Sequence, residues 1–146
     1  MHIRAKSCLL VLQNRIKLTL TFRYKLSLGE VVVTQPTIGS NVEEVNQENV
    51  KLQVWDLGGQ ENLRSAWDSY YEGTNGVIYV IDAADDSSAL VSQLEFMNLI
   101  MHPQLKESPI LIFANKSDLK GAKTLSDISN AFKLHEIKEH DWHIQE

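Results

Sequence analysis

Residues 110–118 read ILIFANKSD, an apolar run of strand length that four polar residues follow at once. Two similar runs precede it, VKLQVW at residues 50–55 and GVIYVI at residues 76–81. All three runs are rich in Val, Ile and aromatic residues, and runs of this length and composition predict buried β-strands. We therefore expect at least three strands in the core.

Helical patterns alternate with these runs. In residues 87–101 four apolar residues recur at helical spacing. They are Leu90, Leu94, Met97 and Met101. Residues 125–134 predict another helix, with Thr124 as its N-cap. Alternating strands and helices predict an α/β domain whose mainly parallel sheet is buried on both faces.

Length and composition limit the classes of protein. A chain of 146 residues with 43% hydrophobic residues can close one core and is too short for two ordinary domains. The net charge of -5 provides no general attraction for a nucleic-acid polymer. The single cysteine, Cys8, excludes an intrachain disulfide and fits a reducing cytoplasmic setting. We expect a monomeric domain.

The first part of the chain differs in charge from the rest. All six lysines and arginines among the first 25 residues precede the first acid, Glu30. Acid-free segments of this kind are typical of organelle transit peptides or of contacts with anionic lipid. Alternatively, an unusual first exon or a mispredicted start has replaced the natural beginning. The sequence predicts an atypical basic segment at residues 1–23 and an incomplete domain at residues 24–146.

Polar clusters follow each predicted strand, at the sheet edge where α/β proteins bind ligands. The sharpest is Asn115-Lys116-Ser117-Asp118. A guanine offers two adjacent N–H donors that one carboxylate, Asp118, can accept together. Asn115 would contact the other edge of the ring, and the alkyl stem of Lys116 would cover one face. Alternatively, these polar residues only form a turn.

A second cluster, Asp56-Leu57-Gly58-Gly59-Gln60, ends the first of the three strands. Asp56 can hold hydrated Mg²⁺, and the glycines allow a backbone N–H to approach a γ-phosphate. Gln60 can orient an attacking water. A tight turn would explain the glycines but would leave Asp56 and Gln60 unexplained. Upstream, Thr37 supplies a hydroxyl suited to completing the coordination of Mg²⁺.

In this order the segments resemble the small GTPases of the Arf family, from about Tyr24 to Gln145. PTIGSNVEEV, VWDLGGQENLRSAWDSYY and ILIFANKSDL resemble its switch I, switch II and guanine-recognition segments. The SN of PTIGSN and the late HDWHIQ resemble the Arf-like subgroup numbered five. The resemblance implies GTP/GDP and Mg²⁺ as cofactors. The residues it implies are Thr37 and Asp56 for Mg²⁺, Gly59 for the γ-phosphate, Gln60 for the water, and Asn115, Lys116 and Asp118 for the base.

The resemblance also implies effector, exchange-factor and activating proteins as partners. Trp55 and Tyr70 occupy two places of the family's aromatic effector surface, whereas Ser40 stands at the third place, where Arf itself commonly has Phe. Simple core packing would equally explain Trp55 and Tyr70. The implied location is the cytoplasm and Golgi or trans-Golgi membranes. His2 follows Met1, so the glycine for myristoylation is absent from that position.

The glycine-rich phosphate loop of the family has no counterpart in this sequence. Counted back from Tyr24 without gaps, residues 9–12 take the place of the first strand, Gln13 that of the first loop glycine, and Thr19 and Leu20 those of the loop Lys and Thr. No glycine precedes Gly29. A phosphate nest needs glycines and a lysine.

The fold class that follows is α/β, a three-layer small GTPase of the P-loop NTPase fold. Its sheet is mainly parallel, and we expect it to be truncated at both ends, without the C-terminal guanine loop and helix. The resemblance implies a GTPase switch in Golgi and endosomal vesicle-mediated and protein transport. The missing glycines predict impaired GTP binding and hydrolysis. The alternatives are a nucleotide-free interaction module and an incomplete gene product.

Overall fold

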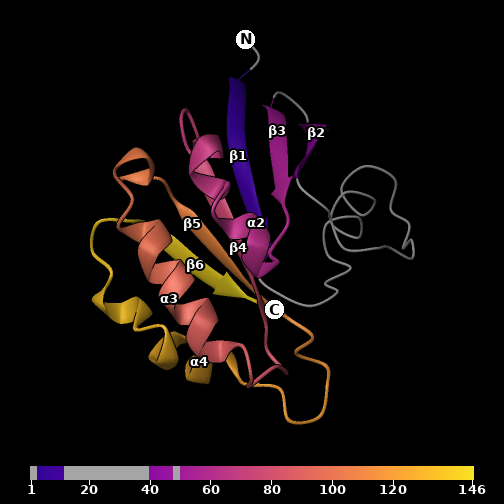
Figure 1. The fold of residues 1–146 in the computed structure, drawn as a ribbon, viewed down its shortest axis with the longest axis vertical. Coiled ribbons are helices and arrows are strands. Elements are labelled where there is room, and N and C mark those ends of the chain that lie inside the picture. The colour runs from indigo at the N-terminus through magenta and orange to yellow at the C-terminus, as the bar shows by residue number, and fades with distance from the viewer. Residues whose placement is uncertain (1–2, 12–39, 48–49) are drawn as a thin grey trace.

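A computed structural model describes residues 3–11, 40–47 and 50–146 of the chain. These residues form a six-stranded sheet in the order β2-β3-β1-β4-β5-β6 (Figure 1). The strands are β1 (Ile3–Val11), β2 (Ser40–Gln47), β3 (Val50–Leu57), β4 (Gly76–Asp82), β5 (Ile110–Asn115) and β6 (Trp142–Gln145). Only the pair β2–β3 is antiparallel, and the other neighbours are parallel. The predicted α/β fold with a mainly parallel sheet is confirmed.

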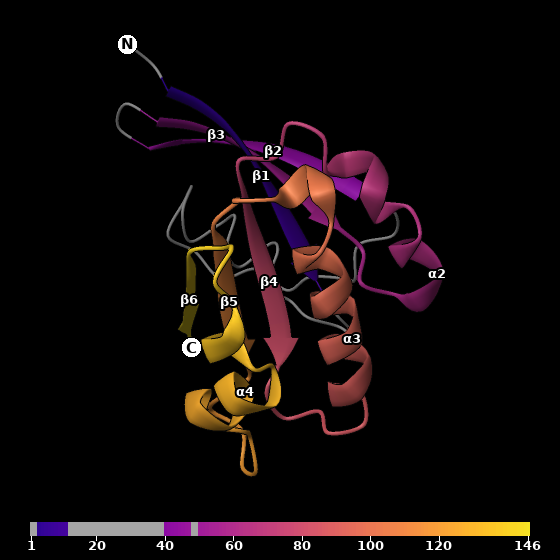
Figure 2. The same ribbon diagram turned by 90° about the vertical axis from the view of Figure 1, so that its left-hand side faces the viewer.

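The described helices lie on one face of this sheet (Figure 2). They are α2 (Glu61–Arg64), α3 (Ala89–Ile100) and α4 (Leu125–Ala131), with short 3-10 helices η1 (Trp67–Tyr70), η2 (Pro103–Leu105) and η3 (Leu134–Glu136). Tyr79 of β4 packs on Phe96 of α3 with ring centroids 5.1 Å apart, and Phe96 meets Phe132 at 5.5 Å. This face therefore carries the main core.

Burial disfavours ionisation of the Tyr79 hydroxyl. Its ring is fully buried, and burial raises the pKa of its hydroxyl well above the ordinary value. The hydroxyl donates a 2.8 Å hydrogen bond to the carbonyl of Ser92 in α3. The bond ties the centre of the sheet to the helix that covers it.

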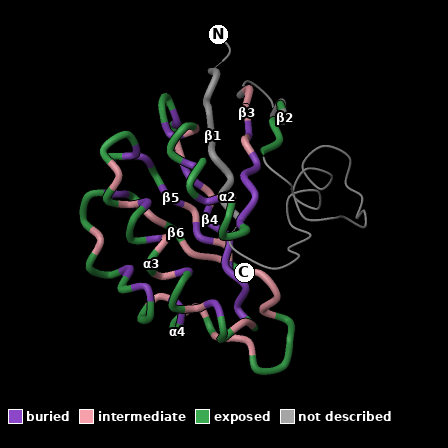
Figure 3. Tube along the Cα trace, in the orientation of Figure 1, coloured by how far each residue is buried: buried purple, intermediate pink, exposed green. Residues whose placement is uncertain are grey.

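The opposite face of the sheet carries a smaller apolar cluster. Val54 and Val80 are buried there, with Leu52, Ile78 and Phe113 packed around them. Burial alternates between the two faces along β5 (Figure 3). The predicted burial of the sheet on both faces is therefore complete under the helices, whereas Leu52, Ile78 and Phe113 on the opposite face are only partly buried.

The helix predicted at residues 87–101 is confirmed as α3, but the four apolar residues that indicated it are not the ones that it buries. The buried residues of α3 are Ser92, Phe96 and Leu99. Those four apolar residues face solvent instead, with exposed fractions that are high for apolar side chains. They are 67% for Leu90, 58% for Leu94, 41% for Met97 and 76% for Met101. The cause is that α3 is apolar on more than one side, so periodicity alone does not choose the inner one.

The predicted cap of α4 is confirmed. The hydroxyl of Thr124 accepts a hydrogen bond from the backbone N–H of Asp127, and the Asp127 carboxylate accepts one from the N–H of Thr124. These reciprocal bonds satisfy two backbone donors that a helix start leaves open. The hydroxyl of Thr124 also holds the pKa of Asp127 below its ordinary value.

The sheet begins inside the segment that the sequence set apart as residues 1–23. Strand β1 lies between β3 and β4, and its register pairs Ser7 with both Val54 and Gly76. The boundary at residue 23 remains a prediction, because residues 12–39 lie outside the described ranges. None of the helices in the described ranges has the length and apolarity needed to cross a bilayer.

Candidate functional site

The carboxyl ends of β3, β4 and β5 meet at one edge of the sheet, because these strands run parallel through β1 (Figure 1). The polar clusters predicted from the sequence follow directly at that edge. Asp56 lies near the end of β3, while Asp82 and Asn115 end β4 and β5 and are register partners. The topology therefore brings the two main motifs to the same side of the domain, as α/β binding sites require.

Two buried side chains hold the loop after β3, and the sequence did not identify either of them as a site residue. The indole N–H of Trp67 donates to the carbonyl of Gly58 at 3.1 Å, and the Nε of Arg64 donates to the carbonyl of Gly59 at 3.1 Å. Trp67 is 3% exposed and Arg64 8% exposed. Both glycine carbonyls are thus fixed by buried donors.

These bonds set the direction of the neighbouring N–H groups. A trans peptide is planar, so the carbonyl of Gly58 and the N–H of Gly59 point in opposite directions. With its carbonyl drawn toward Trp67, this peptide turns the N–H of Gly59 away from the indole. The bond from Arg64 orients the N–H of Gln60 in the same way. Arg64 and Trp67 follow the glycines in the segment LRSAW, but nothing in that pattern indicates that their side chains turn back to the glycine carbonyls.

The loop is also connected to α3. Arg64 forms an ion pair with Glu95 at 3.7 Å, and the arginine side chain is almost fully buried. Asp56 is 2% exposed, and Gln60 stands exposed at the N-cap position of α2 without a side-chain capping bond. The structure therefore places a buried carboxylate, two glycine peptides of fixed orientation and an exposed amide in one short loop.

The loop after β5 contains the predicted base-recognition residues. The N–H of Ala83 donates to the carbonyl of Asn115 at 2.8 Å, which ties this loop to the end of β4. Lys116 has a left-handed backbone with φ of 63°, a conformation that costs energy in residues other than glycine. Its ammonium forms an ion pair with Asp82. Asp118 is exposed, so its carboxylate is accessible to a ligand.

Trp55 and Tyr70 contact each other, as their predicted membership of one surface requires. Their ring centroids are 5.3 Å apart at an angle of 51°. The Tyr70 hydroxyl and the Ser40 hydroxyl share a hydrogen bond of 2.8 Å, which connects the start of β2 to η1. Both rings also pack against the main core, so the alternative of core packing describes part of their role.

Some predicted site residues cannot be placed. Thr37 lies outside the described residues, as do Gln13, Thr19 and Leu20 at the positions of the phosphate loop. Within the described ranges, no three His, Cys, Asp or Glu side chains gather into a metal site. Asp56 is the one predicted Mg²⁺ ligand whose position is described.

Comparison with known protein families identifies the family of the chain. The model of the ADP-ribosylation factor family, Arf, matches residues 3–146. The chain belongs to the Arf family. Members of this family are small GTPases, and the recognition of the family from the switch and guanine-recognition segments is confirmed.

Known relatives agree with this assignment. ADP-ribosylation factor-like protein 5A of Bos taurus is 45% identical over 144 residues, which cover 99% of this chain and 79% of the relative. ADP-ribosylation factor-like protein 5 of Dictyostelium discoideum is 50% identical over 125 residues, 86% of this chain and 68% of the relative. The resemblance to the Arf-like subgroup numbered five is therefore confirmed.

A solved structure has the same fold. The Arl6 BBS3 small GTPase from Trypanosoma brucei, determined with the bound nucleotide analogue GppNp, superposes with a TM-score of 0.85 at 28% sequence identity. The match covers 97% of this chain and 84% of that one. The small GTPase fold of the chain is thus supported by sequence and by structure.

Proposed function

We propose that this chain is an Arf-like guanine-nucleotide-binding protein whose base recognition is retained and whose grip on the phosphates is weak. It would act as a GTP/GDP switch in Golgi and endosomal vesicle-mediated transport and in intracellular protein transport. The observation that carries the proposal is the placement of Asn115, Lys116 and Asp118 at the same sheet edge as Asp56 and Gly59.

The base side fits a guanine. Asp118 is exposed and carries two acceptor oxygens, which match the two adjacent N–H donors of a guanine and not the donor and acceptor of an adenine. The alkyl part of Lys116 can cover a face of the base, because the ion pair with Asp82 anchors its ammonium end. The bond from Ala83 to Asn115 holds the loop in place.

The γ-phosphate and metal side rests on the loop after β3. The buried carboxylate of Asp56 is the kind of oxygen ligand that Mg²⁺ prefers, and the predicted second ligand is Thr37. When bound, Mg²⁺ would neutralise developing charge on the phosphates. The N–H of Gly59, oriented through Trp67, would donate to the γ-phosphate, and Gln60 would orient the attacking water.

The phosphate nest is the weak part. The positions from Gln13 to Leu20 contain no glycine, and a nest of backbone N–H groups depends on glycines. A charge-assisted bond to phosphate contributes roughly 1.5 to 3 kcal/mol, so losing three of them lowers affinity by about 10³-fold to 10⁶-fold. We therefore expect dissociation constants for GDP and GTP that are micromolar or weaker, and slow GTP hydrolysis.

Calorimetric titration of the whole chain with GDP, GTP, guanosine and ATP, each with and without Mg²⁺, tests the proposal. We expect weak binding of all three guanine ligands, with guanosine within about tenfold of GDP because the base provides most of the contacts. A nanomolar dissociation constant for GDP would show that the phosphates are held well. Equal binding of ATP and GTP would remove guanine recognition.

Asp118→Asn isolates the base contact. The substitution replaces one acceptor oxygen by a donor, so we expect guanosine affinity to fall at least tenfold while the fold is unchanged. Asp141→Asn, which changes an exposed aspartate that precedes β6, is a matched control that should bind guanosine as the unsubstituted chain does. Unchanged guanosine affinity in Asp118→Asn would take this residue out of the base-reading role.

A nucleotide-free interaction module is the second candidate. It is favoured by the absence of glycine before Gly29 together with the bond that holds Tyr70 to Ser40. In this case effector proteins would bind the surface of Trp55, Tyr70 and Ser40 without GTP. No heat of binding with any guanine ligand, in a chain whose circular dichroism shows a folded α/β protein, would favour this candidate.

A further inference from the structure

The outward side of α3 carries an apolar stripe formed by Leu90, Leu94, Met97 and Met101, which we call the α3 stripe. These residues are 41% to 76% exposed, and Val91 beside them is 38% exposed. Their spacing of four, three and four residues places them in one line along the helix. This is the spacing of a helix that packs lengthwise against another helix.

None of the fully exposed positions of α3 is charged, and its one charged residue, Glu95, is 29% exposed and paired with Arg64. The exposed positions of the helix are Leu90, Val91, Leu94, Met97 and Asn98, and Met101 follows as the C-cap. The outer side of a surface helix is ordinarily charged or polar. From the exposed fractions, the five apolar side chains present on the order of 500 Å² to water, which is within the size range of the largest apolar patch on a monomer, a patch that often has a function.

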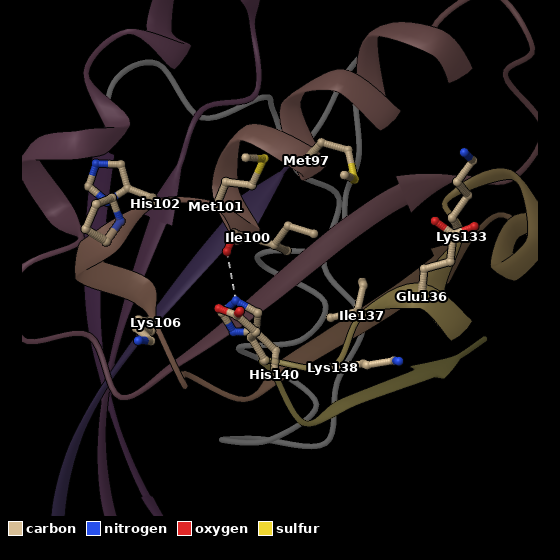
Figure 4. Close-up of a pocket in the computed structure, with 12 residues that line it drawn as sticks. Met97, Ile100, Met101, His102, Lys106, Lys133, Glu136, Ile137, Lys138 and His140 are labelled. Atoms are coloured by element: carbon tan, nitrogen blue, oxygen red, sulfur yellow. Dashed lines mark hydrogen bonds between the residues drawn. The ribbon is translucent and has the colours of Figure 1, made fainter.

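Hollows accompany the stripe on the side of α4. A groove of about 200 Å³ runs beside Leu90, Leu94 and Met97 and is closed by Phe132 and Lys133. A larger one of about 560 Å³ opens at the end of α3, where Met97 and Met101 stand over His140 and Ile137 (Figure 4). The stripe therefore has room beside it for the side chains of an opposing helix.

We propose that the α3 stripe is the interface of a symmetric dimer of this chain, in which α3 of each copy lies antiparallel to α3 of the other. The stripe is self-complementary about a two-fold axis at its midpoint. There Leu94 would face the partner's Met97, and Leu90 would face the partner's Met101. A two-fold interface requires such pairing of one patch with itself. This proposal replaces the expectation of a monomer and does not depend on nucleotide binding.

The charges around α3 select the antiparallel direction. Asp85 and Asp86 precede the helix, and Lys106 follows it at the rim of the larger groove. Asp86 is already paired with Lys123 within the chain, so the choice rests on Asp85. In the antiparallel pair Asp85 would lie opposite the partner's Lys106, whereas a parallel pair would bring the two Asp85 side chains together. Opposed helix dipoles favour the same direction.

The area predicts a weak dimer. Two stripes would bury on the order of 1,000 Å², which is at the low end for specific interfaces. The one charge on α3, that of Glu95, is compensated by Arg64, so the helices bring no uncompensated like charges together. We therefore expect the monomer and dimer to exchange at micromolar concentrations rather than form a permanent complex.

Sedimentation equilibrium of the whole chain, from about 10 µM to about 500 µM, tests the association. The apparent mass should rise from 16.6 kDa toward twice that value. Leu94→Lys should weaken association at least tenfold, and so should Met97→Lys, because each places a charge in the buried line. Leu119→Lys is the matched control, since it changes a leucine that is 48% exposed outside α3 and should associate normally.

Circular dichroism of each variant checks that the fold is intact, and cross-linking checks the direction. A mixture of Leu90→Cys and Met101→Cys chains should form disulfide-linked dimers faster than either variant alone, with the unsubstituted chain as the control for Cys8. The proposal is overturned by a mass of 16.6 kDa at every concentration, by unchanged association of Leu94→Lys, or by faster linking of identical variants. Binding of the monomeric chain to lipid vesicles, lost in Leu94→Lys, would assign the stripe to a membrane and overturn it too.

Discussion

Replacing Trp67 by Phe removes the N–H that holds the Gly58 carbonyl at 3.1 Å while keeping an aromatic ring in a site that is 3% exposed. A buried carbonyl left without its donor costs about 1 to 3 kcal/mol. The smaller ring leaves a cavity on the order of 40 Å³, which adds about 1 kcal/mol at about 24 cal/mol per Å³. We therefore expect Trp67→Phe to lower the free energy of unfolding by about 2 to 4 kcal/mol.

Urea denaturation followed by far-ultraviolet circular dichroism measures this loss. The melting temperature should fall by roughly 5 to 15 °C for a domain of this size. Trp142→Phe is the control, because Trp142 is partly exposed on β6 and should cost less than about 1.5 kcal/mol. The reasoning is refuted if Trp67→Phe lies within about 0.5 kcal/mol of the unsubstituted chain, or if Trp142→Phe costs as much.

Trp67→Phe should also change the conformation of the candidate site. Without the indole donor, the peptide between Gly58 and Gly59 is free to rotate, so the N–H of Gly59 loses its fixed direction. The NMR order parameter of the Gly59 N–H vector should fall in Trp67→Phe and remain unchanged in Trp142→Phe. Equal order parameters in both variants would mean that the loop keeps its conformation without the indole.

Three further predictions concern stability. His140→Phe should cost about 2 to 4 kcal/mol in denaturation experiments, because the ring nitrogens lie 2.8 and 2.9 Å from two backbone carbonyls, whereas exposed His135→Phe should cost under about 0.5 kcal/mol. Thr124→Ala should remove the cap of α4 and cost about 1 kcal/mol by the same measurement, and an unchanged midpoint would contradict the capping role. The hydroxyl of Ser87 holds the pKa of Asp85 below its ordinary value, so this stabilisation is complete above the unfolded-state pKa and is lost as the pH falls through the lowered folded-state pKa. The free energy of unfolding should therefore fall less steeply with decreasing pH in Asp85→Asn than in the unsubstituted chain. Equal slopes for the two proteins would contradict a stabilising role of the Asp85 carboxylate.

The strands and the site edge could be predicted from the sequence because short apolar runs leave few alternatives. The run at residues 110–114 became β5, and the polar tetrad after it lies at the carboxyl end. Parallel strands place their ends together, so motifs far apart in sequence could be assigned to one edge. The first strand extends from Ile3 rather than from residue 9, because backbone pairing with β3 continues beyond the apolar part of the run.

The inner side of α3 and the anchoring of the glycine loop could not be predicted in this way. The buried set Ser92, Phe96 and Leu99 has the same helical spacing as the exposed stripe, and a serine hides the pattern. The side of α3 that faces inward is set by its contacts with the sheet, where the Tyr79 hydroxyl donates a hydrogen bond to the Ser92 carbonyl. The bonds from Arg64 and Trp67 likewise depend on tertiary packing that a sequence pattern does not contain.

The ion pair between Lys116 and Asp82 affects how the loop after β5 treats small anions. A lysine whose charge is already matched by a carboxylate attracts free phosphate or sulfate less strongly than an unpaired lysine does. What the pair leaves to a ligand is the hydrocarbon part of the lysine, against which a flat aromatic ring can pack. The ion pair therefore suits the proposed role of Lys116 in covering a base and not a role in holding free anions.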